Sequence, residues 1–217
     1  MKIATWNIER LKHRKKLDRI VEVLNEVDAD ILVLTEADER VKLPQYEWML
    51  LSDTTRDDSF GYGEHRSIIY SKYGISVPVS LWSNCRSMCE AITTPYGELM
   101  IYSTIIGTYG NRRASFKTEL EEQIFDFDLL VKDGPLCIAG DLNISFSDNY
   151  YYTKHGRDEL NACFERNNLV NLTAELPEAI DHIVVSKSFV KDRSVKLTEW
   201  NLDKSLSDHK GVCVEIL

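Results

Sequence analysis

The sequence predicts an α/β protein in which two helix-backed sheet halves face each other as a layered sandwich. Short apolar runs suit buried strands, two long segments have apolar residues at helical spacing, and the two patterns alternate along all 217 residues. No repeat, low-complexity tract or Pro/Gly/Ser linker interrupts the alternation. A chain of this length fits one domain or a lopsided pair, so we expect a single domain over residues 1–217.

The first part of the chain predicts a strand–helix–strand unit. Residues 3–8 form an apolar strand candidate, and residues 31–34 are a second, wholly apolar one. Between them, a helix with one buried face is indicated by apolar residues at helical spacing, namely Leu17, Ile20, Val21, Leu24 and Val27. A crossover of this kind makes the two strands parallel, so we expect Asn7 and Glu36 at the same sheet edge.

The remaining elements follow from the same two patterns. We expect strands at residues 47–51, 66–71, 75–82, 87–93, 98–106, 135–139, 180–186, 195–200 and 211–217. Two further helices are indicated by the apolar sets Phe116, Leu120, Ile124, Phe127, Val131 and Leu160, Cys163, Phe164. The segment 95–97 is a tight hairpin connection between two of these strands.

Composition excludes several classes of protein. The chain is 43% hydrophobic and 28% charged, which is ordinary for a globular domain. Its apolar runs are far shorter than the ~20 residues that a bilayer requires, and its start becomes polar too early for a signal peptide. The five cysteines are scattered, and we interpret Cys85 and Cys89 as residues near a strand start rather than a metal clip. We therefore expect a cytoplasmic protein with reduced thiols.

The charge of the chain is −9, whereas proteins that bind nucleic acid by general attraction are basic. An acidic balance is compatible with a site that acts on phosphates through metal ions. Positive charge concentrates at Arg10, Lys12, Arg14, Lys15, Lys16 and Arg19. Two interpretations stand for this segment: a solvated helix face, or a rim that faces phosphate.

Polar residues follow five apolar strand candidates, in Thr5-Trp6-Asn7, Leu34-Thr35-Glu36, Gly140-Asp141-Leu142-Asn143, Ile180-Asp181-His182-Ile183 and Ser207-Asp208-His209. Each segment alone is typical of turn chemistry. Together they offer carboxylates for a hard divalent cation, an Asp–His pair and two amides. Such a set suits metal-assisted phosphoester hydrolysis. His182 follows Asp181 within a strand and points to the opposite face, so we expect it to pack.

This ordered set, from Trp6 to His209, resembles the exonuclease–endonuclease–phosphatase superfamily, which includes DNase-I-like nucleases, apurinic/apyrimidinic endonucleases, inositol-polyphosphate phosphatases and sphingomyelinases. The resemblance implies a four-layer sandwich of two mixed β-sheets flanked by helices. It also implies Mg²⁺ or Mn²⁺ as cofactor, and nucleic acid or a phosphorylated small molecule as substrate.

The resemblance implies a role for each matching residue. Glu36 would be the principal metal ligand, with Asn7 and Asp208 completing the metal site. Asp141 would orient or deprotonate the attacking water, and Asn143 would hold that water or the phosphate. His209 would stabilise charge on the phosphate, with its tautomer fixed by Asp181.

One position departs from the family pattern. The family His or Tyr that touches the phosphate is replaced here by Ile105, which can neither donate nor accept a proton. Protonation of the leaving group would then fall to a metal-bound water, to Tyr109 or to Asn111. Arg112 and Arg113 either hold a substrate phosphate or open a helix.

We expect a divalent-metal-dependent phosphoester hydrolase, foremost a nuclease that cleaves nucleic-acid phosphodiesters by in-line attack of water. Two alternatives remain. One is a phosphatase or phosphodiesterase of a small phosphorylated metabolite or head group. The other is a catalytically weak phosphate-binding module, which Ile105 favours and the full set of site residues opposes.

Overall fold

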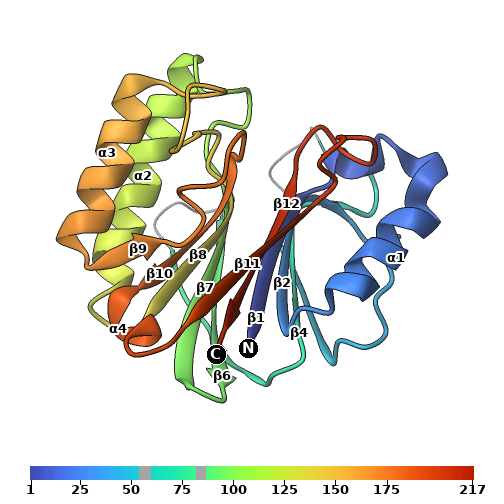
Figure 1. Cartoon of the computed structure of the whole chain (residues 1–217), viewed down its shortest axis with the longest axis horizontal. Coiled ribbons are helices and arrows are strands. Elements are labelled where there is room, and N and C mark those ends of the chain that lie inside the picture. The colour runs from blue at the N-terminus through green and yellow to red at the C-terminus, as the bar shows by residue number, and fades with distance from the viewer. Residues whose placement is uncertain (54–59, 82–86) are drawn as a thin grey trace.

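Two six-stranded sheets lie face to face, with helices on their outer surfaces, in the computed structural model (Figure 1). The structure describes residues 1–53, 60–81 and 87–217. The strand order is β11-β12-β1-β2-β4-β3 in the first sheet and β5-β6-β7-β8-β10-β9 in the second. Both sheets mix parallel and antiparallel neighbours, so the predicted four-layer sandwich is confirmed.

The first sheet contains β1 (Lys2–Asn7), β2 (Ile31–Asp38), β3 (Trp48–Leu51), β4 (Glu64–Ser71), β11 (Val195–Trp200) and β12 (Gly211–Ile216). The second contains β5 (Ile75–Pro78), β6 (Ser87–Thr94), β7 (Gly97–Ile105), β8 (Leu136–Asp141), β9 (Leu169–Asn171) and β10 (Asp181–Ser186). The strand predicted at residues 75–82 is shorter than expected, and part of it lies outside the described residues.

The predicted crossover unit is confirmed, because β1 and β2 are parallel and flank α1 (Leu17–Val27). Asp28 ends the helix in the left-handed conformation, at a φ of 47°, and its amide N–H donates to the carbonyl of Leu24. The strand register pairs Asn7 with Thr35. The residues that follow these two strands therefore emerge at the same edge of the sheet.

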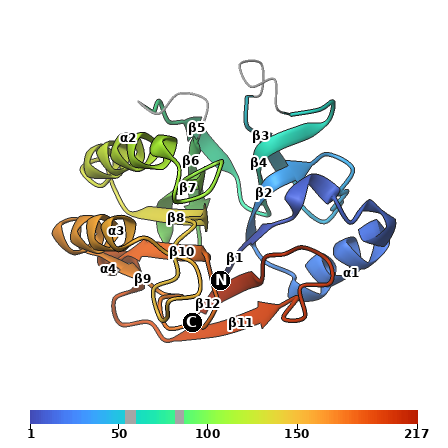
Figure 2. The same cartoon turned by 90° about the horizontal axis from the view of Figure 1, so that it is seen from above.

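Helices cover one outer face of each sheet (Figures 1 and 2). α1 packs on the first sheet, whereas α2 (Ala114–Leu130) and α3 (Lys154–Arg166) lie side by side on the second. Short elements were not predicted, namely η1 (Glu9–Leu11), η2 (Arg14–Lys16), α4 (Lys187–Val190) and β9. They have too few residues to display a hydrophobic period.

The basic segment is not one helix face, so that interpretation is wrong for most of it. The 3-10 turns η1 and η2 contain Arg10, Arg14, Lys15 and Lys16, Lys12 lies between them, and only Arg19 lies in α1. Arg19 is exposed and pairs with Glu22 at 2.7 Å and with Glu26 at 3.3 Å. Its charge is therefore balanced within the helix surface.

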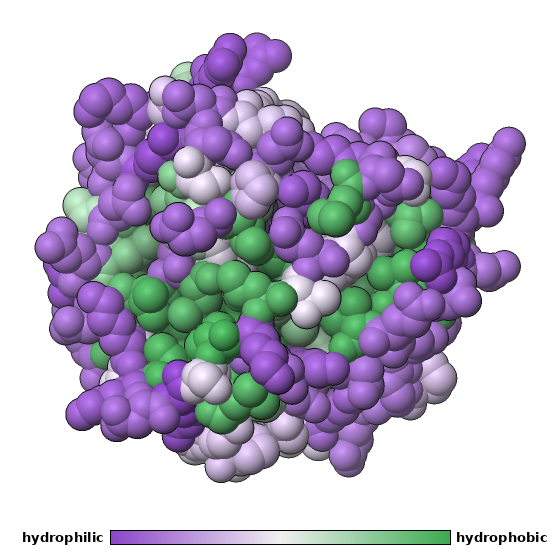
Figure 3. Space-filling model, viewed as in Figure 1, coloured by the Kyte–Doolittle hydropathy of each residue, from purple (hydrophilic) through white to green (hydrophobic). Residues whose placement is uncertain are grey.

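The core has three layers of apolar contacts. The layer between the sheets includes Ile3, Val33 and Ile101, all fully buried. The outer layers lie beneath the helices, where Trp6 packs under α1 and Phe127 belongs to α2. On the face that Figure 3 displays, polar side chains predominate at the periphery and apolar ones gather toward the middle. Burial of these apolar surfaces fixes the two sheets against each other.

Cys89, Cys137, Cys163 and Cys213 are buried free thiols, as expected, and Cys85 lies outside the described residues. Among the helices of residues 1–53, 60–81 and 87–217, none has the length and apolar character needed to cross a membrane.

Gly140 lies close to the backbone of the neighbouring strand in the second sheet. Its φ is 143°, and an added Cβ would lie 2.1 Å from the carbonyl oxygen of Thr104 on the neighbouring strand. Both the backbone conformation and the packing therefore require glycine immediately before Asp141.

We predict that Gly140→Ala lowers the free energy of unfolding by about 3 kcal/mol or more, because β7 and β8 must separate locally. Urea unfolding measures this loss. Gly74→Ala is the matched control, since its Cβ would meet nothing within 4 Å and its φ is not positive. Equal stability of the two variants would contradict the close approach.

Candidate active site

Polar residues at the ends of strands from both sheets lie along one edge of the sandwich. Strands of the two sheets are in contact across the sandwich, among them β10 with β12, β8 with β1, and β7 with β4. Asn7 ends β1, Asp141 ends β8 and Asp181 begins β10. His209 lies just before β12. We call this common edge the site edge, and it brings together residues that are up to 202 positions apart, from 7 to 209.

The amide of Asn7 joins the two sheets. Its Nδ2 donates to Glu36 Oε1 at 3.2 Å and to Asp141 Oδ2 at 3.2 Å. Its Oδ1 accepts from the backbone N–H of Glu9 at 2.9 Å, which fixes the orientation of the amide. Asn7 is fully buried. One side chain therefore holds two carboxylates from opposite sheets close to each other.

A left-handed backbone conformation interrupts the β2–β4 ladder at Glu36. The register with β4 pairs Thr35 with Ser67 and Ala37 with His65, so it is unshifted, and Glu36 itself makes no ladder pair. Its φ is 42°, in the left-handed region. A residue other than glycine is uncommon in this region, and such strain clusters at functional sites. The Glu36 side chain is 30% exposed and its second oxygen lies 3.5 Å from Arg10 Nε.

Asp141 is oriented by the turn that follows β8. Its Oδ1 accepts from the backbone N–H of Asn143 at 2.8 Å, and its Oδ2 accepts from Asn143 Nδ2 at 3.1 Å. The same Nδ2 donates to the carbonyl oxygen of Ile106 at 3.0 Å. Asn143 has a φ of 52°, which Asn tolerates better than most residues. The turn thus fixes both side chains beside the β7–α2 connection.

Asp181 and His209 form a hydrogen-bonded pair at the other side of Asp141. His209 Nδ1 donates to Asp181 Oδ2 at 2.6 Å. Its Nε2 lies 4.0 Å from Asp141 Oδ2 and 3.5 Å from Asp208 Oδ1. The backbone carbonyl of His209 accepts from Trp6 Nε1 at 3.1 Å. His209 is therefore held at its ring by Asp181 and at its backbone by Trp6, and Nε2 faces Asp141 and Asp208.

The buried charges shift two pKa values in ways that matter for chemistry. Burial raises the pKa of Asp141 to about 7, with Asp181 and Glu36 adding to the rise and His209 opposing it. Burial by itself would lower the pKa of His209, but Asp181 and Asp141 outweigh it and raise the pKa to about 10. At neutral pH His209 is therefore a cation, and Asp141 can take up or release a proton.

Asp208 lies at the exposed rim, with 66% of its side chain accessible. Its backbone N–H donates to Glu9 Oε2 at 2.8 Å. Lys12 is hydrogen-bonded to Glu9, and Asp208 and Glu36 also raise its pKa through their charges, so both carboxylates act on the same ammonium group. Among the described residues, the ligand atoms that lie within 4.8 Å of one another belong to Asp141, Asp181 and His209. The metal set Asn7, Glu36 and Asp208 stays a prediction.

The other predicted residues lie around the β7–α2 connection. Tyr109, Arg112 and Arg113 are exposed there. Asn111 is buried, and its Nδ2 donates to the backbone carbonyl of Asn143 at 2.7 Å, so it supports the Asp141 turn. Ile105 is 2% exposed and pairs with Asp141 in the sheet.

His182 packs away from the site edge, as expected. Its Nε2 donates to the carbonyl oxygen of Ile144 at 2.9 Å, and Thr173 Oγ1 lies 2.9 Å from its Nδ1. Burial lowers its pKa to about 4, so the ring is neutral at physiological pH. His182 therefore has a structural role in β10 rather than a catalytic one.

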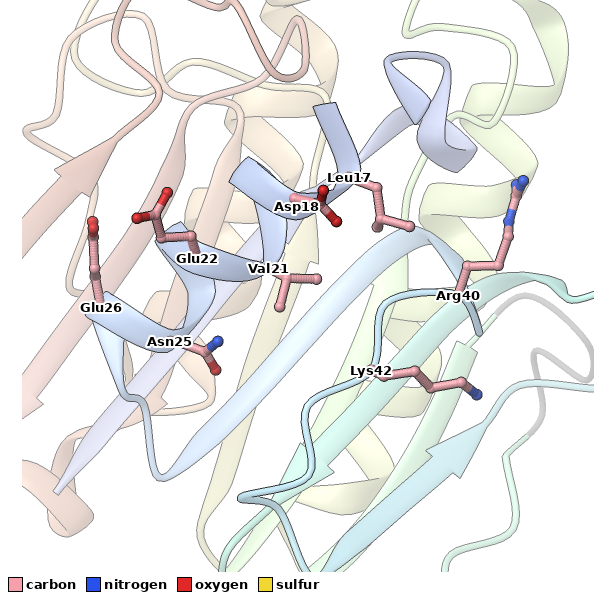
Figure 4. A pocket seen from close by; sticks show the side chains of 8 residues that line it. All are labelled: Leu17, Asp18, Val21, Glu22, Asn25, Glu26, Arg40 and Lys42. Atoms are coloured by element: carbon pink, nitrogen blue, oxygen red, sulfur yellow. The ribbon is translucent and has the colours of Figure 1, made fainter. Parts of the chain in front are cut away.

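Sequence reasoning missed Glu9, Arg66 and Thr108, and it left the role of Arg10 open. Arg66 is 5% exposed, and its Nη1 donates to Thr108 Oγ1 across the two sheets at 2.6 Å. The only sequence signal was a lone Arg within an apolar strand candidate. A hollow beside α1, lined by residues such as Leu17 and Lys42, contains none of the site residues (Figure 4).

We predict that Asp181→Asn in the metal-free protein lowers the pKa of His209 toward its ordinary value near 6.5, because the hydrogen-bonded anion is removed. NMR titration of the His209 ring protons measures this. In the unchanged protein the raised pKa means that the pair stabilises the fold at neutral pH, and that this stabilisation is lost as the pH rises through about 10. An unchanged His209 titration in the variant would contradict the pairing.

The chain is similar to known proteins in both sequence and structure. Residues 4–209 match the Endonuclease/Exonuclease/phosphatase family model. No curated protein matches the chain. Similar solved structures include the 3′ phosphatase NExo from Neisseria bound to product DNA hairpin, with a TM-score of 0.74, 18% identity, and coverage of 100% of this chain and 99% of that chain.

Two other solved structures share the fold at low identity. An AP endonuclease from Archaeoglobus fulgidus has a TM-score of 0.72 and 15% identity, covering 100% of this chain and 99% of that chain. The endonuclease domain of the telomere-specific non-LTR retrotransposon TRAS1 has a TM-score of 0.69 and 15% identity, covering 99% and 97%. Because the family model spans nearly the whole length, this chain belongs to the endonuclease/exonuclease/phosphatase family.

Proposed function

We propose that this chain, acting as one domain over residues 1–217, is a divalent-metal-dependent phosphoesterase that cleaves nucleic-acid phosphodiesters by in-line attack of water. The observation that carries the proposal is the site edge itself. There Asn7 holds Glu36 and Asp141 together, and His209 lies beside them as a partly buried cation. A negative phosphate bound at this edge would meet a fixed positive charge and an oriented base.

The chain's own residues supply most of the chemistry. Asp141, with a pKa raised to about 7, accepts the proton of the attacking water. His209 Nε2 donates to a non-bridging phosphate oxygen and stabilises its charge, while Asp181 fixes the tautomer. Asn143 is directed by its bonds to Asp141 and Ile106, and it positions the water or the phosphate.

The donors at the site edge fit a hard divalent cation. Glu36 is a partly exposed carboxylate, Asn7 lies beside it, and the Asn7 amide holds the carboxylate of Asp141 close to both. Mg²⁺ or Mn²⁺ would be held by Glu36, with Asn7 and Asp208. When bound, the ion supplies charge neutralisation on the phosphate.

Similar solved structures and exposed residues near the site edge support nucleic acid as the substrate. One similar structure is a 3′ phosphatase bound to a DNA hairpin, and another is an AP endonuclease. Tyr109, Arg112 and Arg113 lie exposed on the β7–α2 connection beside Asn143, where they would contact a bound strand. Because Ile105 is apolar and buried, protonation of the leaving group would fall to Tyr109, or to water made more acidic by the cation when that ion is bound.

We predict that Glu36→Gln and His209→Ala each lower kcat/KM for a phosphodiester substrate by about 10²-fold or more, since each removes a charge that acts on the transition state. The assay is cleavage of a labelled oligonucleotide with Mg²⁺ or Mn²⁺, with and without chelator. Glu121→Gln on the exposed surface of α2 is the control and should retain activity.

Unchanged turnover in both site variants would overturn the residue assignment. If small phosphomonoesters are cleaved and oligonucleotides are not, the substrate is a phosphorylated metabolite. Cleavage of a polymeric substrate should weaken steeply with salt because counterion release contributes to its binding, whereas a small monoester should respond much less. If nothing in the panel is cleaved, the chain is a phosphate-binding module.

A further inference from the structure

Another pair of facing strands reaches the site edge beside those that position the catalytic residues. Asp181 begins β10 and His209 lies just before β12, whereas Asp141 ends β8 and Asn7 ends β1. Where β7 faces β4, Arg66 of β4 donates to Thr108, which lies just after β7. Neighbouring strands are about 4.8 Å apart, so this contact lies one to two strand spacings from β8 and β1.

Arg66 is fixed in this position. Its side chain is almost fully buried, and its guanidinium is bonded to Thr108 Oγ1. Thr108 is itself fixed, because its backbone N–H donates to the buried Glu119 at 3.0 Å. A buried arginine with a rigid partner is pre-organised to bind a planar or tetrahedral anion.

Arg10 approaches the same place from the β1–α1 connection. Glu9, Arg10 and Leu11 have φ values of 48°, 51° and 53°, three successive left-handed residues without a glycine. Such strain persists where surrounding structure maintains it, and it clusters at functional sites. The turn directs Arg10 to the oxygen of Glu36 that does not contact Asn7.

The ring of Phe60 connects the two arginines. The guanidinium carbon of Arg10 lies 5.3 Å from the ring centroid, and that of Arg66 lies 5.7 Å from it. Both distances are within the range of cation–π attraction. Two guanidinium groups therefore border one aromatic side chain next to Glu36.

We propose that Arg10, Phe60 and Arg66 form a second phosphate-binding subsite, which holds a phosphate group adjacent to the one being cleaved. The inference rests on the proposed function and narrows its substrate class to molecules with at least two phosphate groups. The source of the second group is either the neighbouring linkage of a nucleic-acid strand or a second monoester on a small molecule.

Binding is measured first, because it does not depend on turnover. Titration calorimetry compares thymidine 3′,5′-bisphosphate with thymidine 5′-monophosphate on the whole chain. We expect the bisphosphate to bind the unmodified protein at least about tenfold more tightly, which is the effect of one charge-assisted contact. Arg66→Gln and Arg10→Gln should each reduce this preference to less than about threefold.

Arg19→Gln is the matched control, since Arg19 is exposed on α1 and paired with Glu22 and Glu26. It should retain the full preference. Thermal unfolding checks each variant, and Arg10→Gln keeps the test decisive if Arg66→Gln is unstable, because Arg10 is 40% exposed. Equal binding of the two probes by the unmodified protein, or a preference that survives in both variants, overturns the subsite.

Turnover then identifies the source of the second phosphate. The substrate is an oligonucleotide in which the linkage next to the scissile one is replaced by a neutral methylphosphonate. If a nucleic-acid strand supplies the second phosphate, this replacement lowers kcat/KM of the unmodified protein and has little further effect on kcat/KM of Arg66→Gln. If the change is without effect while the bisphosphate preference holds, the source is a small-molecule monoester. Absence of all cleavage with an intact bisphosphate preference refutes the proposed function but not the subsite.

Discussion

The amide of Asn7 is the contact on which the site depends. It donates to a carboxylate of its own sheet, Glu36, and to a carboxylate of the opposite sheet, Asp141. A single NH₂ group cannot neutralise two anions, so the contact brings negative charges together without cancelling their repulsion. Burial is the largest cause of the raised pKa of Asp141, and the charges of Asp181 and Glu36 add to the rise. The two-sheet architecture therefore sets the electrostatic environment of this carboxyl group.

Packing, rather than the polar residues, supports this arrangement. The layer between the sheets is apolar, with residues such as Ile3, Val33 and Ile101 fully buried, and it fixes the distance between the two edges. Gly140 lets β8 approach β7 closely just before Asp141. Trp6 and Trp200 pack edge to face at 5.8 Å, and Trp6 also holds the carbonyl of His209. Small shifts in these contacts would change the geometry of the charged groups.

Most of the fold could be predicted from the sequence because its strands and main helices are long enough to show a period, as residues 17–27 do. The crossover rule also placed Asn7 and Glu36 at one edge correctly. Local turns could not be predicted, because the left-handed conformations at Arg10 and Glu36 leave no hydrophobic period in the sequence. The role of Arg66 could not be assigned because it depends on a contact with Thr108, which is distant in sequence and lies in the connection after β7.

The same geometry separates two kinds of charge at the site edge. His209 is held by Asp181 on one side of Asp141, and Arg10 contacts Glu36 on the other. Cations thus border the paired carboxylates from both ends, while Asn7 lies between them. An anion that enters this edge is repelled by the central carboxylates and attracted by the flanking cations. A divalent ion at Glu36 would reverse the sign of the charge at the centre. An extended substrate with several phosphates matches this alternation of charge better than a compact one with a single charge.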